Sequence, residues 1–319
     1  MAMLGWLVLG AEAVPSIWAQ GAGDPADASN PSNVVEDRAT HAAPEDKPLA
    51  MLGRRPLTRQ HVDLVLGRNP ALGLPPLDPA VEKAAIALIA KRMQALQTLR
   101  KLKMAPDRPA ILQWIARAQQ VDAPEDWVQR TSQQWQVDPD TLLETLEFRL
   151  AWEQYLSKHL TEANLSRHFQ NQRSRFDGTR FLISLVTAPA PAGSGPARDA
   201  VAEQLRDWAQ SVTPPVEESA SWSQPPPADW HCDVRRWVRG TGECDPWIVD
   251  AILRLEPGDP PAVIHSAAAV HAVWLHEQQP GERPFEQAQD DVRAHLLVYL
   301  LDYLAGQSAR ELPLQSVSE

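Results

Sequence analysis

The distribution of proline is the feature of this sequence that most constrains its fold. Proline lacks a backbone N–H and its ring clashes with the preceding turn, so it is excluded from helix interiors. Of the 29 prolines in the 319 residues, nine lie in 1–78, five in 79–178 and fifteen after 178. The middle stretch is therefore free to form long helices, whereas the flanking stretches must contain linkers, loops or short strands.

The hydrophobic pattern of residues 49–177 predicts a helical domain. Thr58 and Asp78 are residue types that begin helices, and Pro79 suits a first helical turn. Apolar side chains then recur at intervals of three and four residues, which places them on one helix face: Val81, Ala85, Leu88, Ile89, Met93, Leu96 and Leu99. Further helices are predicted at 108–120, 124–135, 139–158 and 161–175.

The pattern changes after Phe176. Residues 180–187 form a short apolar run, rich in β-branched side chains and bounded by Gly178 and a Pro/Gly loop, which predicts a strand. The following elements are predicted in order: a helix at 197–212, an extended segment near 232–239, a short helix at 246–255, strands at 262–265 and 270–275, and a last helix at 284–305. We therefore expect a small α+β domain at 178–277, followed by a C-terminal helix and tail at 278–319.

The first 48 residues predict a targeting segment and a linker. Residues 1–20 are mostly apolar, and the apolar stretch ends in Ala19 with Ile17 two residues before it, which resembles a secretory signal peptide. Residues 21–48 are rich in Ala, Asp, Pro and Ser, which predicts a disordered linker. We expect an exported protein, periplasmic or secreted, with a merely disordered N-terminus as the alternative. No later segment has 18 uninterrupted apolar residues, so we expect no integral membrane segment in the mature chain.

Charge and cysteine content exclude several function classes. Thirty basic and 41 acidic residues give a net charge of −11 without any basic block, which argues against nucleic-acid binding. Cys232 and Cys244 are compatible with a disulfide in an exported protein and equally with two free thiols. The sequence lacks the CxxC and HxxxH spacings of metal sites, the GxSxG motif and a Gly-rich phosphate loop, so we expect neither a metal nor a cofactor.

Four segments match an ordered set of motifs. LTEANLSRHFQNQRSRFDGTRFLISLV (160–186) contains a lead-in helix, an FDGT junction and a first strand, and residues 232–266 and 267–277 match the segments that follow. LAMLGRRPLTRQHVDLVL (49–66) matches an entry segment. Together they resemble the parvulin-type peptidyl-prolyl isomerases and the exported foldases of the SurA/PpiC type. The resemblance implies a helical chaperone-like domain at 49–177, a parvulin-like domain at 178–277, and a closing helix packed on the helical domain.

The resemblance also implies catalytic positions. The histidine of the family's closing strand falls at His271, and Cys232 or Asp233 lies near the position where the family has Cys or Asp. The family's other histidine falls at Leu185, so the catalytic pair is incomplete. His271 is therefore either a remaining catalytic group or a hydrogen-bonded core residue.

Four further positions are candidates for substrate binding. The two aromatic positions of the family's proline pocket fall at Ile248 and Leu253. Trp222 and Trp230 lie in a Pro-rich loop, where they either bind aromatic-rich client segments or simply pack against the core.

The sequence thus predicts an exported folding factor that binds unfolded or extended polypeptide clients, with weak or absent prolyl isomerisation. One alternative is a fully active isomerase with a rearranged pocket. Another is a non-catalytic scaffold that binds one fixed protein partner.

Overall fold

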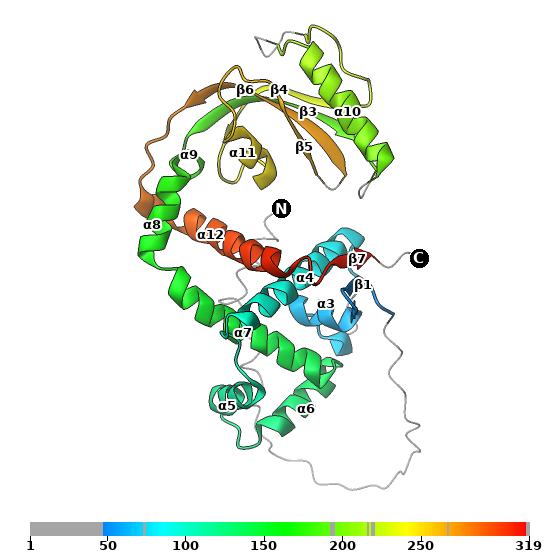
Figure 1. The fold of residues 1–319 in the computed structure, drawn as a ribbon, viewed down its shortest axis with the longest axis vertical. Helices are drawn as coiled ribbons and strands as arrows, with labels where there is room; N and C mark the ends of the chain where they lie inside the picture. Colours follow the sequence, from blue (N-terminus) through cyan, green and yellow to red (C-terminus); the bar gives the residue numbers. More distant parts are fainter. Residues whose placement is uncertain are drawn as a thin grey trace. The chain divides into compact units, whose positions relative to one another are not determined.

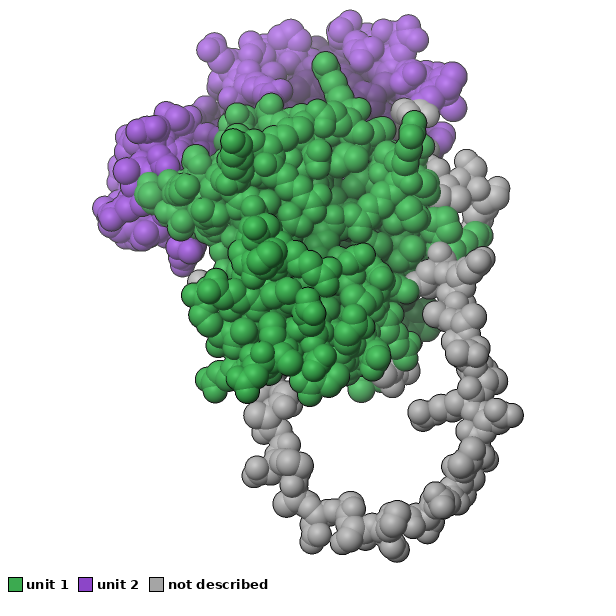
Figure 2. All heavy atoms as spheres, turned by 60° about the horizontal axis from the view of Figure 1, so that its bottom comes forward, with its two compact units in different colours: residues 1–161, 294–319 green, residues 162–293 purple. Residues whose placement is uncertain are grey.

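The computed structural model describes residues 47–72, 75–191, 195–215, 217, 221–266 and 268–316. The predicted signal peptide and nearly all of the predicted linker lie outside these residues. The described chain is a mixed α/β structure of helices and two small antiparallel sheets (Figure 1). It divides into unit 1, residues up to 161 together with 294–319, and unit 2, residues 162–293 (Figure 2). The expected domain boundaries at 177 and 277 both fall inside unit 2.

Unit 1 is mainly helical. Its helices are α3 (Arg59–Leu66), α4 (Pro79–Lys101), α5 (Arg108–Gln119), α6 (Pro124–Trp135), α7 (Pro139–His159) and the later part of α12 (Phe285–Ser308), with a short 3-10 turn at Pro70–Leu72. The side chains of Asp78, Asp107 and Asp138 accept backbone N–H groups at the starts of α4, α5 and α7, and a proline follows within the first turn. The predicted helices of this region are confirmed, and these caps explain where α4, α5 and α7 begin.

A three-stranded sheet in unit 1 joins the two ends of the described chain. β1 (Ala50–Leu52) pairs antiparallel with β2 (Arg55–Leu57) on one side and with β7 (Leu314–Ser316) on the other. Near this sheet, the Thr98 hydroxyl of α4 donates to the Leu304 carbonyl of α12 at 2.8 Å. These three strands were not predicted from the sequence.

Unit 2 contains the second sheet. Its elements are α8 (Glu162–Asn171), α9 (Arg173–Phe176), β3 (Arg180–Pro189), α10 (Pro196–Ser211), β4 (His231–Arg239), α11 (Pro246–Ile252), β5 (Ala262–His265) and β6 (Ala269–Gln279), followed by the start of α12. The four strands are antiparallel in the order β4-β3-β6-β5. The predicted strands at 180–187, 232–239, 262–265 and 270–275 are confirmed, and β3 and β6 extend further than predicted.

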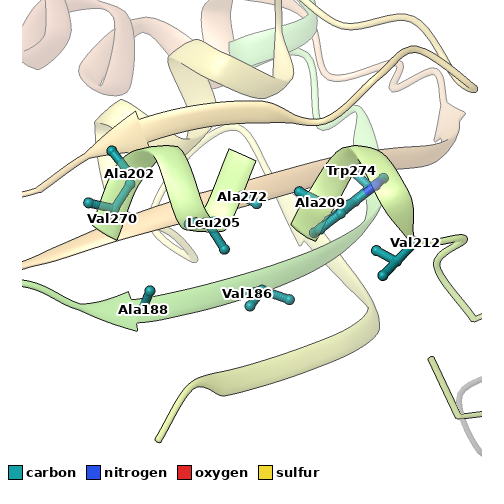
Figure 3. Close-up of a cluster of buried hydrophobic side chains, with 9 residues drawn as sticks. All are labelled: Val186, Ala188, Ala202, Leu205, Ala209, Val212, Val270, Ala272 and Trp274. Carbon is teal, nitrogen blue, oxygen red and sulfur yellow. The ribbon is translucent and has the colours of Figure 1, made fainter. Parts of the chain in front are cut away.

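The sheet of unit 2 has a hydrophobic cluster on each face because successive side chains of a strand point to opposite sides. Figure 3 shows the cluster on the α10 face, where Leu205 and its neighbours on α10 pack on Val186 of β3 and Trp274 of β6. On the α11 face, Ile248 and Ile252 pack on Ile183 and Leu185. The two helices therefore cover opposite faces of one sheet.

The FDGT junction before β3 is held by a network of hydrogen bonds. The Asp177 carboxylate accepts the Thr179 N–H at 3.0 Å, and the Thr179 hydroxyl accepts the N–H of Gly281 at 3.1 Å. The Arg283 N–H donates to the Asp177 carbonyl at 2.7 Å. A Cβ on Gly281 would collide with the backbone of residues 177–179. This motif therefore connects the start of β3 to the segment after β6.

Candidate functional site

The side chain of His271 lies on the α11 face of β6 and is buried, with 7% of its surface exposed. Its Nδ1 is 3.0 Å from the Thr187 hydroxyl of β3, and its Nε2 is 2.8 Å from the Ser266 hydroxyl. The ring of Trp247, from α11, lies 4.5 Å from the imidazole between centroids. His271 is therefore held between two hydroxyls and one indole.

The Ser266 hydroxyl determines which nitrogen of the neutral imidazole carries the proton. It donates to the Ala269 carbonyl at 3.3 Å, so it accepts from His271 Nε2, and Nδ1 accepts from Thr187. The buried guanidinium of Arg198, on α10, donates to the Ala269 carbonyl at 3.0 Å and to the Ser266 carbonyl. Arg198 thus fixes the turn that carries Ser266.

The charge state of His271 follows from its surroundings. Burial lowers the pKa of His271 below its usual value of 6.5, because desolvation disfavours the imidazolium. Asp245, at the start of α11, acts in the opposite direction, and the positive charge of Arg198 adds to the lowering. At neutral pH the imidazole is uncharged and both of its nitrogens are engaged. It presents a fixed polar surface, and a proton transfer to a substrate would require one of these bonds to break.

The strand register places His231 in the same row of the sheet as His271. Thr187 pairs with His231 of β4 on one side and with His271 on the other, and Ile264 of β5 continues the row. Residues opposite one another on paired strands point to the same face. His231 is exposed, and its Nε2 lies 3.3 Å from Asp233. His231 was not among the site residues predicted from the sequence.

The next row contains two of the predicted site residues. Asp233 pairs with Leu185, which pairs with Val273 of β6. Leu185 is buried, and Asp233 forms an ion pair with Arg236 at 3.1 Å. Leu185 therefore lies between Asp233 of β4 and Val273 of β6, and the β3 residue directly opposite His271 is Thr187.

Apolar side chains of α11 and its surroundings cover this face. Ile248 is buried, while Leu253, Trp247 and Ile264 are half-buried and pack against the same cluster. Ile248 and Leu253 thus lie on the His271 side of the sheet, as the family resemblance implies. Their aliphatic side chains, together with Trp247, form its wall.

Three other predicted site residues lie on the α10 face. Cys232 pairs with Val186 and packs with Trp222 and Trp230 against the α10 cluster. The rings of Trp222 and Trp230 contact Trp208 of α10, at centroid distances of 5.2 and 5.5 Å. Trp222 and Trp230 therefore pack against the core, which was the alternative to binding client segments. The sheet separates both tryptophans and Cys232 from His271.

Both cysteines are free thiols. Cys244 packs against the α11 cluster, so the sheet lies between it and Cys232. The disulfide alternative is therefore wrong. Burial is the main cause that raises the pKa of each thiol, which keeps both protonated at neutral pH and makes them poor nucleophiles.

Within the described residues, no group of three or more His, Cys, Asp or Glu side chains is placed to hold a metal ion. None of the described helices is long and apolar enough to span a membrane.

Thr187, Ser266 and Trp247 are the site residues that the sequence analysis missed. Hydroxyl residues at strand ends give no periodic signal, and the pairing of Thr187 with His271 depends on the register of two strands far apart in the sequence. The aromatic residue Trp247, directly before the predicted pocket position Ile248, was the one available signal.

Comparison with known proteins finds similar solved structures. No family model and no curated protein matches the sequence. A peptidylprolyl isomerase, PrsA, from Bacillus anthracis is 12% identical, with 69% of this chain and 94% of that chain covered and a TM-score of 0.29. A SurA-like chaperone of Campylobacter jejuni is 12% identical, with 85% and 99% covered and a TM-score of 0.25. The foldase PrsA of Streptococcus pneumoniae is 12% identical, with 83% and 93% covered and a TM-score of 0.26. These values are too low to assign the chain to a family.

Proposed function

We propose that this chain is a folding factor of the parvulin type, which binds prolyl segments of extended polypeptides at the His271 side of the sheet, with weak or absent isomerisation. The observation that carries the proposal is the engagement of both His271 ring nitrogens, at 3.0 and 2.8 Å, beneath a wall of apolar side chains.

The apolar side chains supply the binding part of the proposal. Trp247, Leu253 and Ile264 are half-buried around the buried imidazole, so part of each can contact a ligand. An aromatic ring beside aliphatic groups suits the compact, apolar ring of proline. Such contacts require no charge and no cofactor, and they are compatible with many different client sequences.

The state of His271 explains why we expect weak catalysis. Rotation about an X–Pro bond is opposed by amide resonance, with a barrier of roughly 18–20 kcal/mol. A catalyst must stabilise the twisted amide more than the planar one, which requires polar groups free to bond to it. His271 already bonds Thr187 and Ser266, and Leu185 has no polar group. Binding without rate acceleration is the expected result.

One observation favours the alternative of an active isomerase. His231 lies in the row of Thr187 and His271, so a second imidazole is present on the same face, supplied by β4. His231 is exposed, so its ring is accessible as a donor that a twisted amide could use. In this alternative, Thr187 lies between the two histidines because it pairs with His231 on one side and with His271 on the other.

A protease-coupled assay with a proline-containing peptide distinguishes the two. We expect the wild-type rate to match that of the His271→Ala and His231→Ala variants, near the uncatalysed rate. A clear acceleration that both substitutions remove would establish the active isomerase instead. Circular dichroism of each variant verifies that it is folded.

Client binding is tested by suppression of aggregation for several unrelated denatured proteins. We expect Trp247→Ala to reduce suppression for all of them. Trp237→Ala is the matched control, because Trp237 pairs with Leu182 and alternates with the α11-face residue Val238, which places it on the other side of the sheet. Suppression for one protein alone would favour the scaffold with a fixed partner.

Export is part of the proposal and rests on residues 1–20. The mass of the mature chain tests it, because signal cleavage removes this segment. An intact Met1 in the exporting host would contradict cleavage.

A further inference from the structure

A hollow of about 630 Å³ lies in unit 2, and it belongs to the side of the sheet opposite His271. Trp274 and Val212, both members of the α10-face cluster, form part of its lining. Pro260 and Pro261, in the turn before β5, form another part. Its volume is in the range of pockets that bind small ligands or single peptide residues.

A β-bulge positions Arg235 at this hollow. Ile183 pairs with Arg236 and Leu185 with Asp233, so Val234 and Arg235 together lie opposite Ser184. Arg235 has a φ of 48°, in the left-handed region that disfavours side chains. The other described non-glycine residues with positive φ are Lys103, Gln120 and Gln136, at helix ends, where this conformation is common. Within β4 this conformation belongs to the bulge, which turns the Arg235 side chain out of the regular alternation of the strand.

The guanidinium of Arg235 makes no ion pair and donates no side-chain hydrogen bond to the residues that the structure describes. The adjacent Arg236 differs, because it pairs with Asp233 at 3.1 Å. Asp259 also lines the hollow, but its carboxylate accepts the Glu256 N–H at 2.8 Å and so closes its own turn. The positive charge of Arg235 is therefore available to a ligand.

His276 provides a second donor beside Arg235. Its Nε2 lies 2.8 Å from the Ser184 hydroxyl, which in turn accepts the Arg235 N–H at 3.1 Å. The Ser184 hydroxyl can then donate its own proton to Nε2. In the neutral imidazole the ring proton is therefore on Nδ1, which can donate. Burial lowers the pKa of His276, and the charge of Arg235 lowers it further, which indicates that the two groups are close. An anion placed between them would offset the positive charge of Arg235.

We propose that this hollow binds the carboxyl terminus of a polypeptide, with the carboxylate at Arg235 and His276 and the last apolar side chain against Trp274 and Pro260. A C-terminal residue carries its carboxylate and its side chain on one Cα. The carboxylate can therefore meet the two donors of the hollow while the side chain meets its apolar wall. An internal Asp or Glu brings the carboxylate without an apolar group on the same residue. The site lies on the other side of the sheet from His271 and does not depend on prolyl binding there.

The test uses the full chain and a short fluorescein-labelled Gly/Ser peptide that ends in leucine. Fluorescence anisotropy compares the free acid with its C-terminal amide and with an amidated peptide that carries an internal glutamate. We expect the free acid to bind roughly ten- to a hundredfold more tightly than either, as for the loss of charge-assisted hydrogen bonds. Arg235→Gln should abolish the difference. Arg239→Gln, an exposed arginine of the same strand that pairs with Glu243, should preserve it.

A second variant keeps the test decisive if Arg235→Gln folds poorly. Arg235→Gly removes the side chain and suits the left-handed backbone, and it should also abolish the preference for the free acid. Equal binding of acid and amide would overturn the proposal, as would a preference that survives in both Arg235 variants. Hexanoate can be added as a competitor. If its affinity equals that of the leucine peptide, the hollow is a site for small carboxylic acids, which would also overturn the proposal.

Discussion

His271 and Thr187 face each other across β6 and β3, with 3.0 Å between Nδ1 and the hydroxyl oxygen. The two residues pair directly in the antiparallel ladder, so the register of the central strands sets the orientation of the imidazole. Ser266 engages the other nitrogen at 2.8 Å. The imidazole is thereby fixed on the face that α11 covers, and this arrangement is the basis on which we propose binding with little catalysis.

The Thr187 hydroxyl should contribute to stability. In Thr187→Val, His271 Nδ1 loses its hydrogen bond while it stays buried, so we expect the free energy of unfolding to fall by about 1–3 kcal/mol. Thr187→Ser keeps a hydroxyl and should recover most of the loss. Urea denaturation measures both variants. Equal stability of Thr187→Val and wild type would show that the bond is unimportant for the fold.

Stability should decrease in acid. Burial is the main cause that lowers the pKa of His168, His271 and His276, all in unit 2, below the usual 6.5. The unfolded chain then binds more protons than the folded chain as pH falls through about 6.5, so protonation favours unfolding. We expect the urea midpoint to be constant above about pH 7.5 and lower at pH 5.5. His276→Gln should weaken this dependence. A midpoint that rises between pH 7.5 and 5.5 would contradict the assignment.

Gly281 should tolerate no side chain. A Cβ at this position would collide with the backbone of residues 177–179, which cannot move without breaking the bonds of Asp177 and Thr179. We expect Gly281→Ala to lower the free energy of unfolding by more than about 2 kcal/mol. Gly306→Ala is the control, because no atom lies within 4 Å of the added Cβ, and alanine favours the helix by up to about 1 kcal/mol. Thermal denaturation should therefore separate the two variants in opposite directions.

Arg235→Gly should stabilise the protein. The left-handed backbone at φ 48° costs a residue with a side chain roughly 1–3 kcal/mol, and glycine removes this cost. We expect a net gain of about 1 kcal/mol, since glycine also increases the entropy of the unfolded chain. Chemical denaturation measures the gain. A loss of stability would mean that the Arg235 side chain supports the fold.

Periodicity and start signals were sufficient to predict most elements. The helix that begins after Asp78 and the strand that begins at Arg180 depend on local features, namely a cap with a regular apolar spacing and a β-branched run. The sheet of β1, β2 and β7 was not predictable in this way. Its strands have three residues each, and the pairing of Ala50 with Ser316 joins opposite ends of the chain.

The site was only partly predictable for a similar reason. The family resemblance led to His271, but its partner Thr187 follows from strand register. Cys232 and Asp233 are adjacent in sequence, yet they point to opposite faces, so only one of them can share the face of His271. The bulge at Arg235 has no signal in the sequence, because Asp233–Arg236 has the appearance of an ordinary strand.

Prolyl binding on the His271 face can be followed by the NMR signal of the Trp247 indole N–H during titration with an unfolded proline-containing peptide. Trp247 contacts His271 at 4.5 Å between ring centroids, so a prolyl group bound on this face must change its environment. Trp247→Phe assigns the signal. We expect a saturable shift with the proline peptide and little shift when alanine replaces proline. Identical shifts with both peptides, or none with either, would contradict it.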